Sequence, residues 1–407
     1  MGKNGRFGKE YGKVVGKDSA SRPGWKGPGY VKKSDSPAKA KAKNTGPESV
    51  NPPSESVIPI ELQQSLLDIF RNMFSGILAA DTLQPLLQEV KTALYERDFS
   101  RAFGSQEYLA AYSVRWSPSR SLCYLSILVD LQIHLSEILA FCRTSQLDVI
   151  QGNGFPSSCP TTLKSTLTVV CFGGGAAEVV AFGGFLRFLL DASTTERTDT
   201  EASSNLSISD KEQGVDLLLI DTAQWGDIVQ MLNTGLTTPP LLSNYASSSA
   251  KEANSSLISA GRVATTFRCD NVLDLSQNEL DDIAGRSQTL LTLFFTLNEL
   301  YATSIGKTTA LLLRLTTAAK PGTLLLIVDS PGSYSETTVG KDAKKYPIQW
   351  LLDHTLLETE KNRGQDGTSN WLKVFSDDSR WFRLPDGLRY PIPLENMRYQ
   401  ISLYRRL

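Results

Sequence analysis

The sequence contains few residues of the types that bind transition metals. Of its 407 residues, two are histidine and five are cysteine, and no two cysteines form a Cys-x-x-Cys pair. A structural zinc site needs four clustered nitrogen or sulfur ligands, so the sequence predicts no metal site. Isolated thiols without regular spacing are typical of reduced cysteines in an intracellular protein.

Long hydrophobic runs are also missing. No stretch reaches the roughly 18 apolar residues that a membrane-spanning helix needs. The basic residues near the N-terminus are not followed by an apolar segment, which excludes a secretory signal. We therefore expect a protein that does not insert into a membrane.

The net charge is only −1, but the two signs are unevenly distributed. Residues 1–43 hold 12 Lys and Arg and three acids, a net charge of +9, which leaves −10 for the rest of the chain. A terminal block of one sign is typical of a solvated tail that meets a polyanion or acts as a targeting signal.

Residues 1–56 contain nine glycines, six prolines and almost no aliphatic side chains, which predicts a disordered tail. Aromatic residues lie among its lysines: Phe7, Tyr11, Trp25 and Tyr30. Basic side chains interleaved with rings indicate an arm that contacts RNA or directs the protein to the nucleus. A tail that only improves solubility has the same composition.

Between residues 57 and 159 the hydrophobic pattern is helical, and we interpret this segment as a cap that helps to bind the substrate. Apolar residues three and four apart indicate a first helix: Leu62, Leu66, Ile69, Met73 and Ile77. We predict a second helix from Asp81, a third from near Ser105 and a long fourth over about 118–142. Ser117 would be the N-cap of the fourth, and Pro118 suits its first turn.

Arg115, Trp116 and Arg120 surround the predicted start of that fourth helix. The exposed amides and the positive end of the dipole favour an anion there, so the two arginines are candidates for RNA phosphate contacts. Trp116 is a candidate for stacking on a base. Alternatively, both arginines are ordinary surface residues or form salt bridges within the protein.

After residue 160, short apolar strands alternate with helices. The candidate strands are 166–172, 215–220, 263–268, 289–295, 323–328, 371–375 and 398–405. This alternation predicts an α/β fold with a doubly wound, seven-stranded sheet. The last two strands lack an intervening helix, which predicts an edge hairpin with an antiparallel final strand. Two polar insertions, 193–214 and 237–262, are predicted to be flexible surface loops.

The strongest local motif is a glycine loop that follows the first predicted strand. Gly173, Gly174 and Gly175 come directly after it, and Glu178 lies near the start of the next helix. Glycines allow a tight turn and a close approach of the backbone to a ligand. Enzymes that bind NAD use a similar loop, but Glu178 occupies the place of their third glycine.

A nucleoside triphosphate site is excluded. Gly306, Lys307 and Thr308 resemble the end of a P-loop, but Tyr301 stands where that motif requires an upstream glycine. The segment also has the pattern of a helix.

Polar residues follow the next three strands. Asp221 ends the strand 215–220, where its carboxylate is able to accept both hydroxyls of a ribose or to cap a helix. At the ends of the following two strands lie Asp270 with Asn271, suited to an adenine amino group, and Asn298 with Glu299.

A glycine loop, an acid for ribose, an acid for adenine and polar residues after the fourth strand, in this order, resemble class I S-adenosylmethionine-dependent methyltransferases. The resemblance covers about 160–407. It implies that Gly173, Gly174, Gly175 and Glu178 line the methionine end of S-adenosylmethionine, that Asp221 holds the ribose, and that Asp270 and Asn271 meet the adenine. Asn298 and Glu299 would face the transferred methyl group. Cys171 departs from the pattern, because an acid often stands there.

Three segments narrow the resemblance: Tyr112–Arg120, the loop Cys-Phe-Gly-Gly-Gly-Ala-Ala-Glu, and Lys-Pro-Gly-Thr before the fifth strand. Over about 57–407 they resemble a fungal family whose characterised member is a 25S rRNA uridine-N3 methyltransferase. The resemblance implies a monomeric enzyme that acts on ribosomal RNA or a pre-ribosomal particle. It also implies a location in the nucleus or nucleolus, with the cytoplasm as a further site.

Methylation of uridine N3 requires loss of the imide proton, and Glu299, Asn298 and Asp221 are candidates to accept or polarise it. The base must be unpaired or flipped, with Trp225 or Trp116 to stack on it. Two other functions fit the same pattern: a protein methyltransferase on this fold, and a non-catalytic RNA-binding factor of ribosome assembly.

Overall fold

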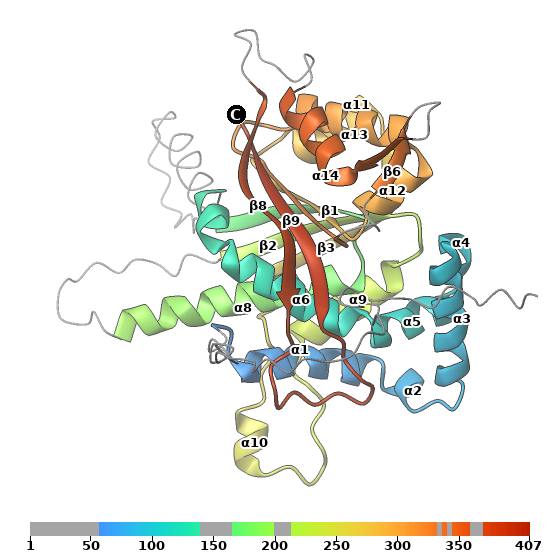
Figure 1. The fold of residues 1–407 in the computed structure, drawn as a ribbon. Coiled ribbons are helices and arrows are strands. Elements are labelled where there is room, and N and C mark those ends of the chain that lie inside the picture. Colours follow the sequence, from blue (N-terminus) through green and yellow to red (C-terminus); the bar gives the residue numbers. More distant parts are fainter. Residues whose placement is uncertain (1–56, 139–164, 199–212, 332–335, 340–343, 359–368) are drawn as a thin grey trace, which may run out of the picture. The chain divides into compact units, whose positions relative to one another are not determined.

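A computed structural model describes residues 57–138, 165–198, 213–331, 336–339, 344–358 and 369–407 (Figure 1). The predicted basic tail, 1–56, and the predicted boundary between cap and sheet at 159/160 lie outside these ranges. Residues 55–407 form one compact unit.

Helices form the first part of this unit. They are α1 (Ile60–Met73), α2 (Ser75–Leu78), α3 (Leu83–Glu96), α4 (Phe99–Ala102), α5 (Gln106–Arg115) and α6 (Ser117–Asp130), followed by Gln132–Ile138. As predicted, the third long helix, α5, begins near Ser105. Ser105 is its N-cap, because its hydroxyl accepts a hydrogen bond from the Tyr108 amide at 3.2 Å. The second long helix, α3, begins at Leu83, two residues after the predicted start at Asp81.

Three of the helix predictions were wrong. The first helix stops at Met73, so Ile77 belongs to the short α2. The fourth helix ends at Asp130 instead of continuing to about 142, and the chain bends by 72° before Gln132–Ile138. The bend allows Leu135 and Ile138 to be buried. Ser117 is a buried helical residue and not the N-cap, because α6 follows α5 with only Trp116 between them.

Within the described residues, a seven-stranded sheet has the order β3-β2-β1-β4-β5-β9-β8. Its strands are β1 (Ser165–Phe172), β2 (Gln213–Asp221), β3 (Val263–Cys269), β4 (Leu290–Phe294), β5 (Leu324–Asp329), β8 (Trp371–Phe382) and β9 (Met397–Arg406). The first five are parallel, and β9 pairs antiparallel with both β5 and β8. The predicted fold class, edge hairpin and antiparallel last strand are confirmed, although β9 lies inside the sheet and β8 forms its edge.

Alternate residues of the parallel strands enter two separate cores. Val169 and Cys171 of β1 pack on one face, whereas Val170 and Phe172 pack on the other. The first face is covered by α6, α8 (Ala176–Thr198), α9 (Gly226–Thr237) and α1 (Figure 1). The second is covered by η1 (Val272–Asp274), α11 (Gln277–Ala284), α12 (Leu297–Thr303), α13 (Ile305–Ala318), α14 (Ile348–Asp353) and the π-helical turn η3 (His354–Glu358). Burial on both faces explains the uninterrupted apolar runs.

The helical N-terminal region and the sheet share the first core. Leu66 and Phe70 of α1 and Leu125 of α6 belong to the same buried cluster as Phe182 of α8. Leu66 lies so close to Gly184 of α8 that a Cβ atom on this glycine would come within 2.6 Å of its side chain. The two regions therefore form one packed body.

The polar insertions are more ordered at their ends than predicted. Residues 193–198 continue α8, while 199–212 lie outside the described ranges. Within 237–262, α10 (Ser248–Glu252) forms a short helix, and buried Ile258 donates its amide to the Leu236 carbonyl at 3.0 Å. A small hairpin that was not predicted joins β6 (Glu336–Val339) to β7 (Lys344–Pro347).

In the part of the chain that the structure describes, no single helix is long and apolar enough to cross a membrane. One pair, Ser117–Asp130 with Gln132–Ile138, passes that test only when its two bent segments are joined.

Candidate active site

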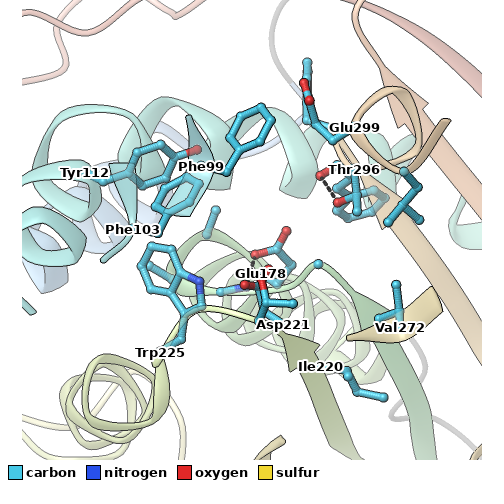
Figure 2. Close-up of a pocket in the computed structure, with 18 of the residues that line it drawn as sticks. Phe99, Phe103, Tyr112, Glu178, Ile220, Asp221, Trp225, Val272, Thr296 and Glu299 are labelled. Carbon is cyan, nitrogen blue, oxygen red and sulfur yellow. Dashed lines mark hydrogen bonds between the residues drawn. The ribbon is translucent and has the colours of Figure 1, made fainter. Parts of the chain in front are cut away.

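A cavity of about 620 Å³ lies at the carboxyl ends of β1, β2 and β4. Its walls come from the loops after these strands and from α3 to α6. Figure 2 shows the rings of Phe99, Phe103, Tyr112 and Trp225 gathered on one side, with Glu178 and Asp221 beside them. This volume is within the range of small-molecule and cofactor pockets.

Each glycine of the loop is needed for a different steric reason. Gly173 has φ +76°, and a Cβ atom there would lie 2.3 Å from the Thr296 hydroxyl oxygen. At Gly174 a Cβ atom would lie 2.5 Å from that of Cys171, and at Gly175 it would approach the Trp225 ring at 3.1 Å. Gly173 and Gly175 line the cavity as predicted, and Gly174 packs beneath it.

Glu178 lies in the first turn of α8 and lines the cavity. Its Oε2 atom accepts the Gly175 amide at 2.8 Å, which holds the carboxylate over the glycine loop. Burial raises the pKa of Glu178 to about 7, although hydrogen bonds from the Gly175 and Glu178 amides and the charge of Arg120 oppose the shift.

Asp221 ends β2 and also faces the cavity. Its Oδ1 atom accepts the Ala223 amide at 2.7 Å. Burial raises the pKa of Asp221 to about 6, against the hydrogen bonds from Ala223, Thr222 and the Trp225 side chain. These hydrogen bonds fix the carboxylate at the edge of the cavity.

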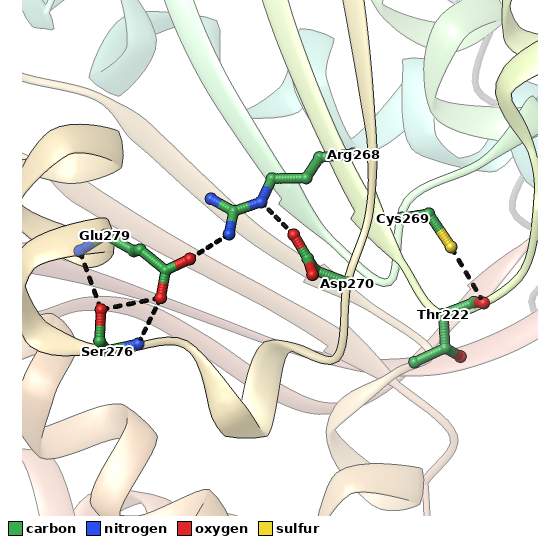
Figure 3. A network of polar contacts seen from close by, with 6 residues as sticks. All are labelled: Thr222, Arg268, Cys269, Asp270, Ser276 and Glu279. Atoms are coloured by element: carbon green, nitrogen blue, oxygen red, sulfur yellow. Dashed lines mark hydrogen bonds and ion pairs between the residues drawn. The ribbon is translucent and has the colours of Figure 1, made fainter.

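Asp270 and Asn271 line the cavity after β3, but protein groups already contact both side chains. Asp270 forms an ion pair with Arg268, which also contacts Glu279 of the α11 capping box (Figure 3). The side-chain oxygen of Asn271 accepts the Leu273 amide at 3.1 Å and so caps η1. These contacts hold the two residues at the edge of the cavity, and their contact with the adenine stays a prediction.

The two residues predicted to face the methyl group point in different directions. Asn298 is buried and does not line the cavity, since its Nδ2 and backbone amide donate to the Asp329 carboxylate at 2.7 and 2.9 Å. Glu299 does line the cavity. Its Oε2 atom is buried, without a hydrogen-bond partner among the residues that the structure describes, and burial raises the pKa of its carboxyl while Arg97 opposes the shift.

The two arginines near the start of α6 also differ in their surroundings. Arg115 does not line the cavity, because its guanidinium pairs with Glu395 and donates to the Pro393 carbonyl at 3.2 Å. For Arg115, the alternative interpretation, a salt bridge within the protein, is therefore correct. Trp116 and Arg120 line the cavity, and Arg120 hydrogen-bonds the Tyr112 hydroxyl.

Phe295 is a cavity residue that sequence reasoning missed. It is a non-glycine residue with φ +56°, immediately after β4. Its ring lies 6.3 Å from that of Tyr124, and its centroid is 4.9 Å from the Arg120 guanidinium carbon. Such left-handed backbone is costly and concentrates at functional sites. Only the aromatic pair Phe294-Phe295 at a strand end hinted at it.

Comparison with known proteins decides the family. The family model described as "Putative SAM-dependent methyltransferase" matches residues 70–405. The chain belongs to this family. The methyltransferase thus uses S-adenosylmethionine, and the glycine loop, the carboxylate that ends β2 and the cavity volume fit that cofactor.

Individual known proteins are also similar to this methyltransferase. It is 30% identical over 371 residues to the 25S rRNA (uridine(2843)-N(3))-methyltransferase of Saccharomyces cerevisiae, which covers 88% of this chain and 91% of the relative. A methyltransferase structure from Methanosarcina mazei matches with a TM-score of 0.30 and 10% identity, over 62% of this chain and 99% of that one. The 1,6-didemethyltoxoflavin-N1-methyltransferase of Burkholderia thailandensis, with S-adenosylhomocysteine bound, matches with a TM-score of 0.32 and 12% identity, over 78% and 88%.

Cofactor affinity should depend on pH through Glu178 and Asp221. Both pKa values are raised, to about 7 and about 6. In their predicted roles the two carboxyls would have to ionise, Glu178 to pair with the ammonium group of the cofactor and Asp221 to accept the ribose hydroxyls. We expect S-adenosylhomocysteine to bind about tenfold or more weakly at pH 5.5 than at pH 7.5, and binding to release protons. Titration calorimetry in two buffers measures both. The variant E178Q should flatten the dependence, and equal affinities at the two pH values would contradict the assignment.

The same shifts act on folding with the opposite sign. Because the folded-state pKa values of Glu178 and Asp221 lie above their unfolded values, these groups stabilise the free protein most at low pH. They lose that contribution as pH rises through about 6 to 7.

Proposed function

We propose that this enzyme methylates N3 of a uridine in large-subunit ribosomal RNA. The observation that carries the proposal is the 30% identity over 88% of the chain with the yeast 25S rRNA uridine-N3 methyltransferase. That alignment spans the helical region as well as the sheet, so it includes both walls of the cavity.

Glu299 supports this chemistry. The lone pair of uridine N3 becomes available to a methyl group only after the imide proton has left. Glu299 presents a carboxylate to the cavity, and its raised pKa makes it a better proton acceptor than an ordinary exposed glutamate. S-adenosylmethionine supplies the methyl group. We propose that Glu299 takes the proton, N3 forms the bond to the methyl carbon, and S-adenosylhomocysteine leaves with the sulfur electron pair.

Asn298 is a poorer candidate. Both its amide groups are directed to Asp329, and its role is to hold the start of α12 against the end of β5. Asp221 is held at the end of β2 by the Ala223 amide, and this position suits binding of the ribose better than removal of the uridine proton.

The aromatic lining supports a flipped base. N3 lies on the edge used in base pairing, so the uridine must leave its stack to react. Phe99, Phe103, Tyr112 and Trp116 come from the helical side and give the cavity an aromatic lining, as stacking on a base would require. Trp225 lies against the glycine loop, which favours the cofactor and not the base as its neighbour.

We extend the proposal to the partner and the location. The +9 charge of residues 1–43 would draw the acidic remainder to ribosomal RNA or a pre-ribosomal particle, to which the enzyme binds as a monomer. Arg120 is turned into the cavity and Arg115 is paired with Glu395, so neither is part of an exposed phosphate site. We propose the nucleus or nucleolus as the main location, with the cytoplasm as a further one.

Mapping of modified nucleosides tests the substrate. Mass spectrometry of ribosomal RNA from cells that lack this chain should show loss of one N3-methyluridine, restored by the wild-type gene and not by D221A. Unchanged N3-methyluridine would contradict the proposal. In that event a lost methyl-lysine or methyl-arginine would identify a protein methyltransferase, and unaltered methylation with impaired ribosome assembly would identify a non-catalytic factor.

A further inference from the structure

Arg120 is placed unusually for an RNA-contacting arginine. It lies in the second turn of α6, and its side chain reaches into the cavity. Its guanidinium carbon lies 5.5 Å from the centroid of the Tyr112 ring and 4.9 Å from that of Phe295. Among the described residues, the guanidinium of Arg120 donates a hydrogen bond to the Tyr112 hydroxyl. A guanidinium carries five N–H donors, and the Tyr112 hydroxyl takes only one of them, so the group has donors to offer a ligand in the cavity that it lines.

Glu178 presents the opposite charge to the same cavity from α8. The two groups are close enough for their charges to influence each other, but no ion pair joins them in the described part of the chain. Each is held by other groups, Arg120 by Tyr112 and Glu178 by the Gly175 amide. A separated pair of fixed opposite charges beside a glycine loop is complementary to a small zwitterion.

The other charged residues of the lining do not offer this complementarity. The lining residues include five acids, Asp98, Glu178, Asp221, Asp270 and Glu299, and two cations, Arg97 and Arg120. The charge of Arg97 acts on Glu299, on another part of the lining. Arg120 is thus the cation available to an anionic group bound near Glu178.

We propose that Arg120 and Glu178 together bind the amino-acid end of the cofactor, the guanidinium pairing with the α-carboxylate and Glu178 with the α-ammonium. Glu178 then fills the role of the acid that Cys171 replaces. Because Arg120 belongs to the helical region, that region contributes directly to cofactor binding. This inference requires only the cofactor and does not depend on the RNA substrate.

Calorimetry with two ligands tests the proposal without RNA. S-adenosylhomocysteine has the amino-acid end, whereas 5′-methylthioadenosine has the same adenine, ribose and sulfur without it. We expect R120Q to weaken S-adenosylhomocysteine binding about 10- to 100-fold and to leave 5′-methylthioadenosine binding unchanged. R120K, which keeps the charge but not the fork of donors, should lose less. R71Q, on an exposed arginine of α1, is the matched control.

Two outcomes would overturn the proposal. Equal losses for both ligands would mean that Arg120 only maintains the shape of the cavity through Tyr112 and Phe295. Unchanged affinity for both, with a lower methylation rate, would assign Arg120 to the RNA substrate. Failure of the uridine-N3 assignment would leave the two-ligand result unaffected, so the two proposals are tested separately.

Discussion

Replacement of Asp221 by alanine is expected to abolish measurable cofactor binding. The carboxylate lines the cavity at the end of β2 and is held there by the Ala223 amide, and in its predicted role it would accept two ribose hydroxyls. Hydrogen bonds to a charged acceptor contribute roughly 1.5–3 kcal/mol each, so loss of both weakens S-adenosylhomocysteine binding by at least about 100-fold. Titration calorimetry measures the loss.

Two controls separate this effect from unfolding. D221N keeps an oxygen for the Ala223 amide, and because burial raises the pKa of Asp221, removing its charge should not lower stability at pH 7.5. D227A removes an exposed acid six residues away and should bind normally. Unchanged affinity in a folded D221A protein would show that the ribose is bound elsewhere.

Replacement of Glu299 by glutamine is expected to lower kcat about 10²- to 10⁴-fold, the usual contribution of a general base. Glutamine has nearly the same shape but does not accept the imide proton at neutral pH. Affinity for S-adenosylhomocysteine should stay within about twofold, because Glu299 lies apart from the glycine loop and Asp221 (Figure 2). Single-turnover methylation of ribosomal RNA gives the rate.

The pH profile distinguishes a proton acceptor from a structural residue. The wild-type rate should rise with pH and level off above the pKa of Glu299, since only the ionised carboxylate accepts a proton. The E299Q rate should continue to rise into the alkaline range, where the uridine imide ionises in solution. E252Q, an exposed acid of α10, serves as the control. If E299Q kept the full rate and profile, Asp221 or water would have to take the proton.

Much of the fold could be predicted because its signals are local. Strands buried on both faces are uninterrupted apolar runs, and all seven candidate strands overlap observed ones. Gly173, Glu178 and Asp221 were found in the same way, because local sequence places each of them near the carboxyl end of a strand. Gly173 follows β1, Glu178 lies in the first turn of the next helix, and Asp221 is the last residue of β2.

Features that depend on distant contacts could not be predicted. Asn298 and Glu299 are adjacent, but Asp329, 31 residues beyond Asn298, turns the former inward. Arg115 is occupied by Glu395, 280 residues away. The bend after Asp130 follows from burial against the sheet, and no proline or glycine at this point marks it. The roles of Arg120 and Phe295 follow from helices and strands meeting at one cavity.

The core shared by α1, α6 and α8 also bears on how the nucleotide enters. An enzyme with two separate domains opens by a hinge between them, whereas here the opposite walls of the cavity cannot part without exposing Leu66, Leu125 and Phe182 to water. Entry and product release therefore rely on local displacement of the wall. The lining segment Arg97–Ser100 runs from the end of α3 into the first residues of α4, and three of its four residues are exposed. Turnover of this enzyme is therefore not expected to require closure of one domain on another.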